Sequence, residues 1–237
     1  EQAIVVDRSI KRKMEDEFKR QGAYFLDDHD KKRVASIILK NGALNPKIVG
    51  KSPQDIAEMA GIVVPSHARV LIAEETNVGK SYPFSVEKLA PILALYTVEN
   101  SNEASTLSNE LLELGGLGHT LGIHCEDKQI IETFGSEKPA SRIVVNSGTT
   151  FGGIGATTEI QPSLTLGCGS FGGNITSDNI GPQHLLNMKR VAFGVREMKK
   201  EEVTTASENQ VNHSDQLSIS RAEITEIIKG VLQEMKL

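Results

Sequence analysis

The chain has 237 residues, with 26 Lys and Arg against 31 Asp and Glu, and a formal net charge of −5 at pH 7. This length can bury a sizeable hydrophobic core, and the acidic balance gives no attractive field for a nucleic-acid backbone. No run of about 18 apolar residues could span a bilayer, and the first residues do not form a secretory signal. We therefore expect a cytoplasmic protein that binds neither nucleic acid nor membrane.

The two cysteines, Cys125 and Cys168, have neither paired spacing nor a basic residue within a few positions. The spacing indicates no disulfide framework and no zinc site, which is typical of a protein in a reducing compartment. A cysteine without a neighbouring cation usually packs as a small apolar group. Neither cysteine is therefore expected to be a nucleophile.

Short apolar runs alternate with helical patterns along most of the chain. Strands are expected at residues 2–6, 69–73, 92–98, 120–124 and 143–146, and helices at residues 10–21, 28–39, 53–60, 106–114 and 127–134. Ser52 is the expected N-cap of the third helix, and the fourth is expected to end in a left-handed turn at Gly115 and Gly116. Parallel strands need crossovers, which are usually helices, so this alternation predicts an α/β fold whose mostly parallel sheet is covered on both faces.

The C-terminal third has a different amino-acid composition. Residues 147–181 are rich in Gly, Ser, Thr and Asn, which is typical of a functional loop, and a closing helix is expected at residues 183–191. We expect the domain to cover residues 1–198 and to be followed by a flexible polar linker at residues 199–218.

Residues 219–237 are expected to form an isolated amphipathic helix. Ser220 and Glu223 have capping-box spacing. The apolar residues that follow recur at steps of three and four and share one face: Ile224, Ile227, Ile228, Val231, Leu232 and Met235. Because a short helix on a polar tether is marginal alone, this stripe implies a partner surface or packing against its own domain.

Three sequence patterns resemble ligand sites, but the residues around each pattern argue against such a site. Gly79 precedes Lys-Ser, but Glu74 occupies the place where a phosphate-binding loop needs glycine. The glycines at 167, 169 and 172 match a dinucleotide fingerprint, but no helical pattern follows them. His119, His124 and Cys125 lie close in sequence, but a strand would turn neighbouring residues to opposite faces. We therefore predict no phosphate-binding loop, no independent dinucleotide fingerprint and no metal site.

Four segments carry a family resemblance. They are, in chain order, Glu87-Lys-Leu-Ala-Pro91, Gly116-Leu-Gly-His-Thr120, the glycine-rich stretch Pro162–Asn174 and the segment Asn179–Val191, which contains the expected closing helix. Together they resemble the CoA-acylating branch of the aldehyde dehydrogenase superfamily, the acetaldehyde and propionaldehyde dehydrogenases. The resemblance covers about residues 1 to 198, and it implies the aldehyde dehydrogenase catalytic fold.

The resemblance also implies roles for particular residues. Glu87 would bind the nicotinamide ribose of NAD, and Leu89 would pack against the nicotinamide. His119 would orient or deprotonate the thiol of coenzyme A, although a structural hydrogen bond in its strand is the alternative reading. The glycine-rich stretch would line the acyl and pantetheine channel and supply the other cofactor-binding residues, Gly167, Gly169, Ser170, Phe171 and Gly172.

In the resembling enzymes the nucleophilic cysteine and the oxyanion-hole asparagine precede the stretch that matches Glu1. We therefore expect this chain to supply one wall of the site of an oxidoreductase that converts a short-chain aldehyde, NAD and CoA to acyl-CoA and NADH. On that reading the chain alone lacks the nucleophile and is inactive. A non-catalytic scaffold or pseudoenzyme is the alternative, and the residues do not distinguish acetaldehyde from propionaldehyde.

The terminal amphipathic helix is similar to the encapsulation peptides that load such enzymes into bacterial microcompartments. This similarity implies a shell protein as partner and the microcompartment lumen as location. The superfamily resemblance further implies a homo-oligomer.

Overall fold

The computed structural model describes residues 2–197 of the chain. The chain forms two units, Glu1–Asn187 and Met188–Leu237, and the elements described below all lie in the first. The expected linker at residues 199–218 and the expected amphipathic helix at residues 219–237 lie outside the described residues.

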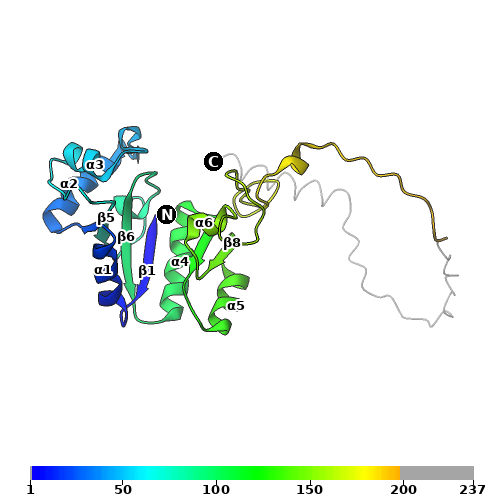
Figure 1. Ribbon diagram of the computed structural model, residues 1–237, viewed down its shortest axis with the longest axis horizontal. Helices are drawn as coiled ribbons and strands as arrows, with labels where there is room; N and C mark the ends of the chain where they lie inside the picture. Colours follow the sequence, from blue (N-terminus) through cyan, green and yellow to red (C-terminus); the bar gives the residue numbers. More distant parts are fainter. Residues whose placement is uncertain (1, 198–237) are drawn as a thin grey trace, which may run out of the picture. The chain divides into compact units, whose positions relative to one another are not determined.

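The main sheet has four parallel strands in the order β1-β6-β5-β2 (Figure 1). They are β1 (Ala3–Asp7), β6 (Ile92–Val98), β5 (Val70–Glu74) and β2 (Ala23–Phe25). The α/β fold with a mostly parallel sheet is thus confirmed. Strand β2 is absent from the sequence prediction because three residues give no recognisable alternation.

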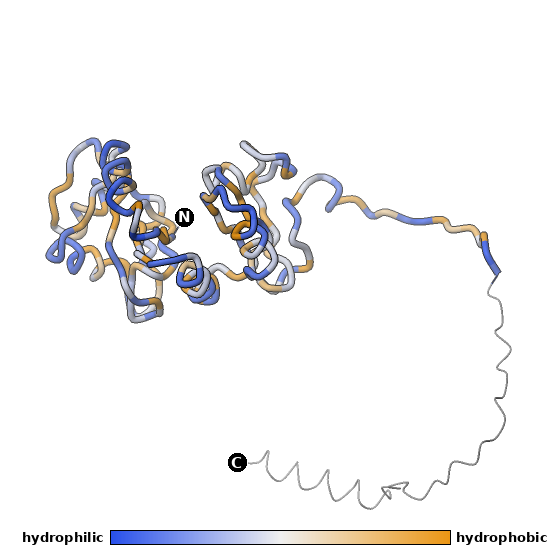
Figure 2. Tube along the Cα trace, turned by 90° about the horizontal axis from the view of Figure 1, so that it is seen from below, coloured by the Kyte–Doolittle hydropathy of each residue, from blue (hydrophilic) through white to orange (hydrophobic). Residues whose placement is uncertain are grey.

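Side chains of β6 alternate between two apolar cores, so both faces of the main sheet are buried. Ile92, Ala94 and Tyr96 belong to the larger core, whereas Leu95 belongs to the smaller one. The larger core also takes residues from α2 (Asp28–Ile38), α3 (Pro53–Ala60) and α4 (Ser101–Gly115), and the smaller one takes residues from α1 (Lys11–Arg20). Figure 2 shows hydrophobic and hydrophilic stretches alternating along the chain.

A second, two-stranded sheet follows α4. Strand β7 (Gly118–Ile123) runs parallel to β8 (Ala140–Val145), and α5 (Lys128–Glu137) connects them. The short helix α6 (Thr149–Gly153) packs against both strands. The remaining elements are the antiparallel pair β3 (Leu39–Lys40) and β4 (Ala43–Leu44) and the 3-10 turns η1 (Pro46–Ile48), η2 (Pro83–Ser85) and η3 (Pro182–Leu185).

Two helix ends show where local signals sufficed and where they failed. Helix α3 has the expected bounds because Ser52 and Asp55 form a capping box and Gly61 ends the helix with a φ of 67°. Helix α4 begins five residues earlier than expected, with Asn100 as its N-cap. The expected left-handed turn at its end is wrong, because Gly116 has a φ of −138° and the positive φ, 72°, falls at Gly118.

The closing helix expected at residues 183–191 is also wrong. The structure has only η3 there, followed by chain without regular structure. Leu185 and Leu186 are 85% and 66% exposed, so among residues 2–197 a helix at this place would have no surface against which to bury its apolar face. Within residues 2–197 no helix combines the length and the apolar character needed to cross a bilayer.

Candidate functional site

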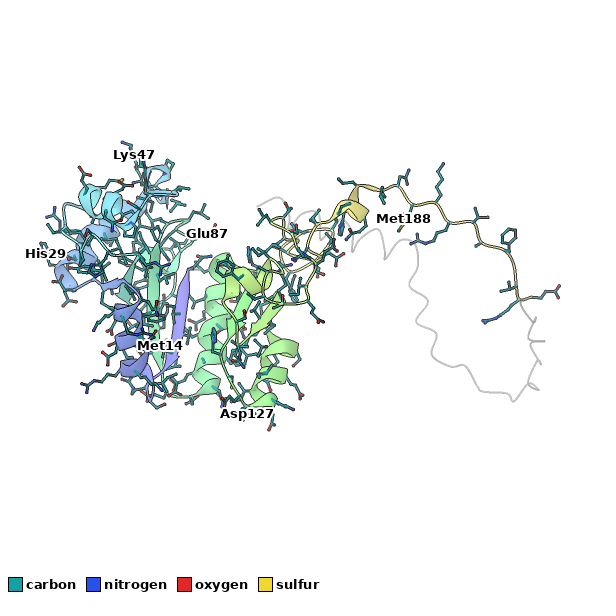
Figure 3. All side chains as sticks on the ribbon, in the orientation of Figure 1. Met14, His29, Lys47, Glu87, Asp127 and Met188 are labelled. Carbon is teal, nitrogen blue, oxygen red and sulfur yellow. The ribbon has the colours of Figure 1, made fainter. Side chains whose placement is uncertain are left out.

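The first part of the candidate site is the loop of residues 86–91, which leads from η2 into the amino end of β6. Glu87 and Leu89 are exposed on this loop, and Lys88 between them is only 1% exposed. Figure 3 shows Glu87 on this loop, beyond the end of the main sheet. The two side chains expected to contact the nicotinamide nucleotide are therefore both accessible.

Leu89 has an unusual backbone. Its φ is 48°, in the left-handed region that non-glycine residues rarely adopt, and its side chain is 57% exposed. The amide of Gly50 donates to the carbonyl of Leu89 at 2.9 Å and holds this conformation from a neighbouring loop. Backbone strain that presents an apolar side chain to solvent is typical of ligand-contacting positions.

Buried polar groups support the segment that precedes this loop. The hydroxyl of Tyr96 donates to the carbonyl of Asn77 at 3.1 Å, and Ser85 Oγ donates to the carbonyl of Gly79 at 2.9 Å. Burial, together with the negative charge of Glu75, raises the pKa of Tyr96 to about 12. The phenol therefore stays protonated and continues to donate at neutral pH.

The second part of the site is the glycine hairpin, which we define as residues 165–180. The amide of Gly167 donates to Asp178, that of Gly169 to Thr176 and that of Ile180 to Thr165, at 2.8, 2.9 and 2.9 Å. This antiparallel pattern confirms that no helix follows the glycine fingerprint. The segment is a hydrogen-bonded hairpin, with Ser170 and Phe171 exposed at its turn.

Close packing of backbone against backbone explains the hairpin's glycines. A Cβ at Gly167 would lie 2.3 Å from the carbonyl oxygen of Thr176, and one at Gly172 would lie 2.3 Å from the Cβ of Cys168. The amides of Gly167, Gly169 and Gly172 all donate within the hairpin, so these N–H groups are already used. Contact of the five predicted hairpin residues with a cofactor stays a prediction.

The structure brings the second and third sequence motifs together. A Cβ at Gly118, the first residue of β7, would lie 1.8 Å from the carbonyl oxygen of Cys168. The glycine hairpin therefore rests directly against the residue that precedes His119, although some 50 residues separate them in sequence.

His119 lies on β7, where the charges of Glu87 in the loop of residues 86–91 and of Arg142 on β8 act on it. Partial burial and the positive charge of Arg142 lower its pKa, and the negative charge of Glu87 opposes them. The imidazole is therefore neutral at pH 7 and can accept a proton. The geometry is compatible with either role of His119, and the catalytic one stays a prediction.

Arg142 on β8 is a supporting residue that the sequence did not reveal. Its guanidinium donates to Thr120 Oγ1 at 3.0 Å, to the carbonyl of Ser177 at 2.9 Å and to the carbonyl of Gly167 at 2.8 Å. Only 5% of the residue is exposed. Arg142 thus fixes the glycine hairpin to the second sheet, and a single buried arginine in a strand gives no periodic signal that could have predicted this.

A cavity of about 530 Å³ lies between the start of β8 and the glycine hairpin. Gly169, Ser170 and Phe171 line it together with Ser141 and Asn174. Three of the predicted cofactor-binding residues therefore share one hollow, while Glu87, Leu89 and His119 lie outside its lining.

Cys125 and one acidic cluster lie outside this arrangement, whereas Cys168 belongs to the glycine hairpin. Cys125 is half-buried and contacts the carbonyl of Asp127 at 3.8 Å. Oxygen and nitrogen atoms of Asp27, His29 and Asp30 gather within 4.8 Å of one another. Asp27 caps α2 and Asp30 accepts a hydrogen bond from Tyr24, so both carboxylates have structural roles.

Comparison with known proteins places this geometry in a family context. No protein-family model matches the chain. It is 45% identical over 197 residues to the aldehyde-alcohol dehydrogenase of Clostridium acetobutylicum, covering 81% of this chain and 23% of that protein. It is 65% identical, with a TM-score of 0.81, to the crystal structure of an acetylating aldehyde dehydrogenase from Geobacillus thermoglucosidasius, covering 84% of this chain and 44% of that one.

More distant structures share the fold and hold ligands. A propionaldehyde dehydrogenase from the fucose-utilisation microcompartment of Clostridium phytofermentans is 25% identical with a TM-score of 0.66, covering 76% of this chain and 40% of that one. At 26% identity, an engineered glycolyl-CoA reductase holds NADP⁺ and the Rhodopseudomonas palustris propionaldehyde dehydrogenase holds propionyl-CoA. The homologues of this chain are acylating aldehyde dehydrogenases, and the chain spans less than half the length of those named here.

Proposed function

We propose that this chain forms part of a CoA-acylating aldehyde dehydrogenase that converts a short-chain aldehyde, NAD and CoA to acyl-CoA and NADH. The observation that carries the proposal is the loop of residues 86–91, where exposed Glu87 and Leu89 flank a buried lysine. An exposed glycine-rich turn and a neutral histidine complete a surface suited to a nucleotide and a thiol. A purely scaffolding role would not require this strained loop, so the scaffold alternative is less favoured.

The residues present fit a nicotinamide nucleotide. A carboxylate accepts hydrogen bonds from two ribose hydroxyls, and the exposed Leu89 offers an apolar face for a flat ring. NAD, when bound, accepts the hydride of the oxidation. In this proposal Glu87 binds the ribose, and Leu89 keeps water from the nicotinamide ring.

The residues present also fit the thiol end of coenzyme A. Neutral His119 accepts a proton from the thiol, and the thiolate is the better nucleophile towards an acyl group. The exposed turn at Ser170 and Phe171 borders the path of the pantetheine arm, and Arg142 holds this turn in place. Acetaldehyde and propionaldehyde are the substrates we propose.

The test is an assay of the protein expressed from its complete gene. NADH formation should require aldehyde, NAD and CoA together, and it should be fastest with aldehydes of two or three carbons. Rapid NADH formation from an alcohol or a sugar, with none from an aldehyde, would contradict the proposal. The 237-residue chain purified alone should form no NADH, because the proposed nucleophile is neither Cys125 nor Cys168.

We further propose that residues 219–237 direct this enzyme into the lumen of a bacterial microcompartment by binding a shell protein. The support is the apolar stripe of the sequence together with the microcompartment origin of one structural relative. Burial of an aliphatic side chain contributes about 1.5 to 3 kcal/mol, so several of them can hold a short helix in a groove. Confinement of a volatile aldehyde in the compartment suits the proposed reaction. We also propose that the active assembly is a homo-oligomer.

A fluorescent fusion tests this second proposal. Residues 217–237 fused to a fluorescent protein should co-localise with microcompartment shells, and Ile227→Asp combined with Leu232→Asp should make the fusion diffuse. A diffuse parent fusion, or a double variant that localises like the parent, would contradict the proposal.

A further inference from the structure

Lys88 is the buried residue between the two exposed side chains of the loop at residues 86–91. Its Nζ donates to the carbonyl of Phe84 at 2.6 Å, to that of Val86 at 2.9 Å and to that of Gln2 at 3.1 Å. An ammonium group has three N–H donors, so all three have a carbonyl acceptor. The first bond reaches η2, the second stays within the loop, and the third reaches the residue that precedes β1.

This arrangement is costly for the protein. Burial disfavours the charged ammonium and lowers the pKa of Lys88 to about 7, while the negative charges of Glu75 and Glu87 raise it. Glu75 is in turn paired with Lys31 of α2 at 3.0 Å. A methionine would fill the same space without the desolvation cost, so the contribution of Lys88 lies in its three hydrogen bonds.

Two features of the loop of residues 86–91 require that Lys88 be held in place. The Lys88 side chain is buried while those of Glu87 and Leu89 on either side are exposed, so holding Lys88 inward holds both neighbours outward. The left-handed backbone of Leu89 persists only if its surroundings hold it. The bond to Gln2 joins this loop to the start of β1, which is the neighbour of β6 in the sheet.

We propose that Lys88 is a positioning residue, whose ammonium fixes Glu87 and Leu89 towards the nicotinamide nucleotide and couples their loop to the amino end of β1. The inference rests on the proposed function for the identity of the nucleotide. The coupling itself concerns only this chain's backbone, and it can be measured without any activity.

The test compares Lys88→Met with Lys80→Met in the protein expressed from its complete gene. Methionine keeps the length of the side chain and removes its three donors. Lys80 is an exposed lysine eight residues earlier and serves as the matched control. Measurements are made below pH 7, where the ammonium is protonated, and at a temperature at which circular dichroism shows both variants folded.

Amide hydrogen exchange is the first readout. Lys88→Met should speed exchange both in residues 84–92 and in residues 2–7, whereas Lys80→Met should leave both segments unchanged. Faster exchange in residues 84–92 alone would overturn the coupling to β1. If Lys88→Met does not fold, the wild type provides the second measurement, because saturating NAD should slow exchange in both segments together, and slowing in only one would overturn the coupling.

Kinetics is the second readout, and it separates positioning from general stability. A misplacement of about 1 Å can cost about a hundredfold in rate, so Lys88→Met should raise the KM for NAD or lower kcat by at least about tenfold. The KM for the aldehyde should stay close to that of the wild type. Unchanged KM for NAD and unchanged kcat in the folded variant would overturn the positioning role. A wild type that neither binds NAD nor forms NADH would overturn the proposed function instead and leave the exchange result standing.

Discussion

Replacement of Arg142 by methionine should destabilise the glycine hairpin selectively. Arg142 is 5% exposed, and its guanidinium donates to the carbonyl of Gly167 at 2.8 Å and to Asn179 Oδ1 at 3.4 Å, both buried acceptors. Methionine fills the space of the aliphatic part of the arginine side chain but donates no hydrogen bond. A buried acceptor left without a partner costs about 1 to 3 kcal/mol, so losing both predicts about 2 to 6 kcal/mol. The carbonyl of Ser177 adds less, because this residue is exposed and water can replace the bond.

Urea denaturation followed by circular dichroism measures this free energy of unfolding, and amide exchange shows where the loss falls. Exchange should accelerate in residues 165–180 before it accelerates in the main sheet. Arg12→Met is the matched control, since Arg12 is exposed on α1 and its replacement should change stability by less than about 0.5 kcal/mol. An Arg142→Met variant as stable as this control, with exchange unchanged in the hairpin, would refute the reasoning.

Three further substitutions test individual residues in the complete enzyme. Glu87→Gln removes the charge from the ribose contact, worth about 1.5 to 3 kcal/mol, and should cost roughly ten- to hundredfold at subsaturating NAD; unchanged kinetics would place Glu87 outside the site. His119→Gln should leave the first burst of NADH intact and slow CoA-dependent turnover by about a hundredfold or more. Because the pKa of His119 is lowered, the wild type should keep its basic form at pH 7 and lose this step as the pH falls through that pKa, a dependence that the variant should lack. Cys168→Ala should keep its NADH formation, and an abolished rate would identify Cys168 as the nucleophile.

Elements with strong local signals could be predicted from the sequence. Helix α3 carries both its caps in the sequence, and β6 is a seven-residue run that is apolar except for Thr97, so their bounds agree with the prediction. The helix expected at residues 183–191 failed because its apolar residues have no described surface to cover, and only tertiary packing decides that.

Candidate site residues could be proposed from the sequence only where a motif lay on one continuous stretch. The sequence indicated Glu87 and Leu89 through their shared segment, but it could not show that Gly118 and Cys168 meet, because that contact depends on the path of the chain. Lys88 and Arg142 were missed for a related reason. A buried cation is recognisable only from the acceptors that surround it, and these include the carbonyl of Gln2 for Lys88 and that of Gly167 for Arg142, both far away in sequence.

The ratio of acyl-CoA to NADH measures the central claim most directly. The protein expressed from its complete gene is incubated with propionaldehyde, NAD and CoA, and mass spectrometry quantifies propionyl-CoA and free propionate. The account predicts one propionyl-CoA for each NADH and little propionate, because CoA rather than water takes the acyl group. Propionate as the main product, with CoA left unconsumed, would contradict it.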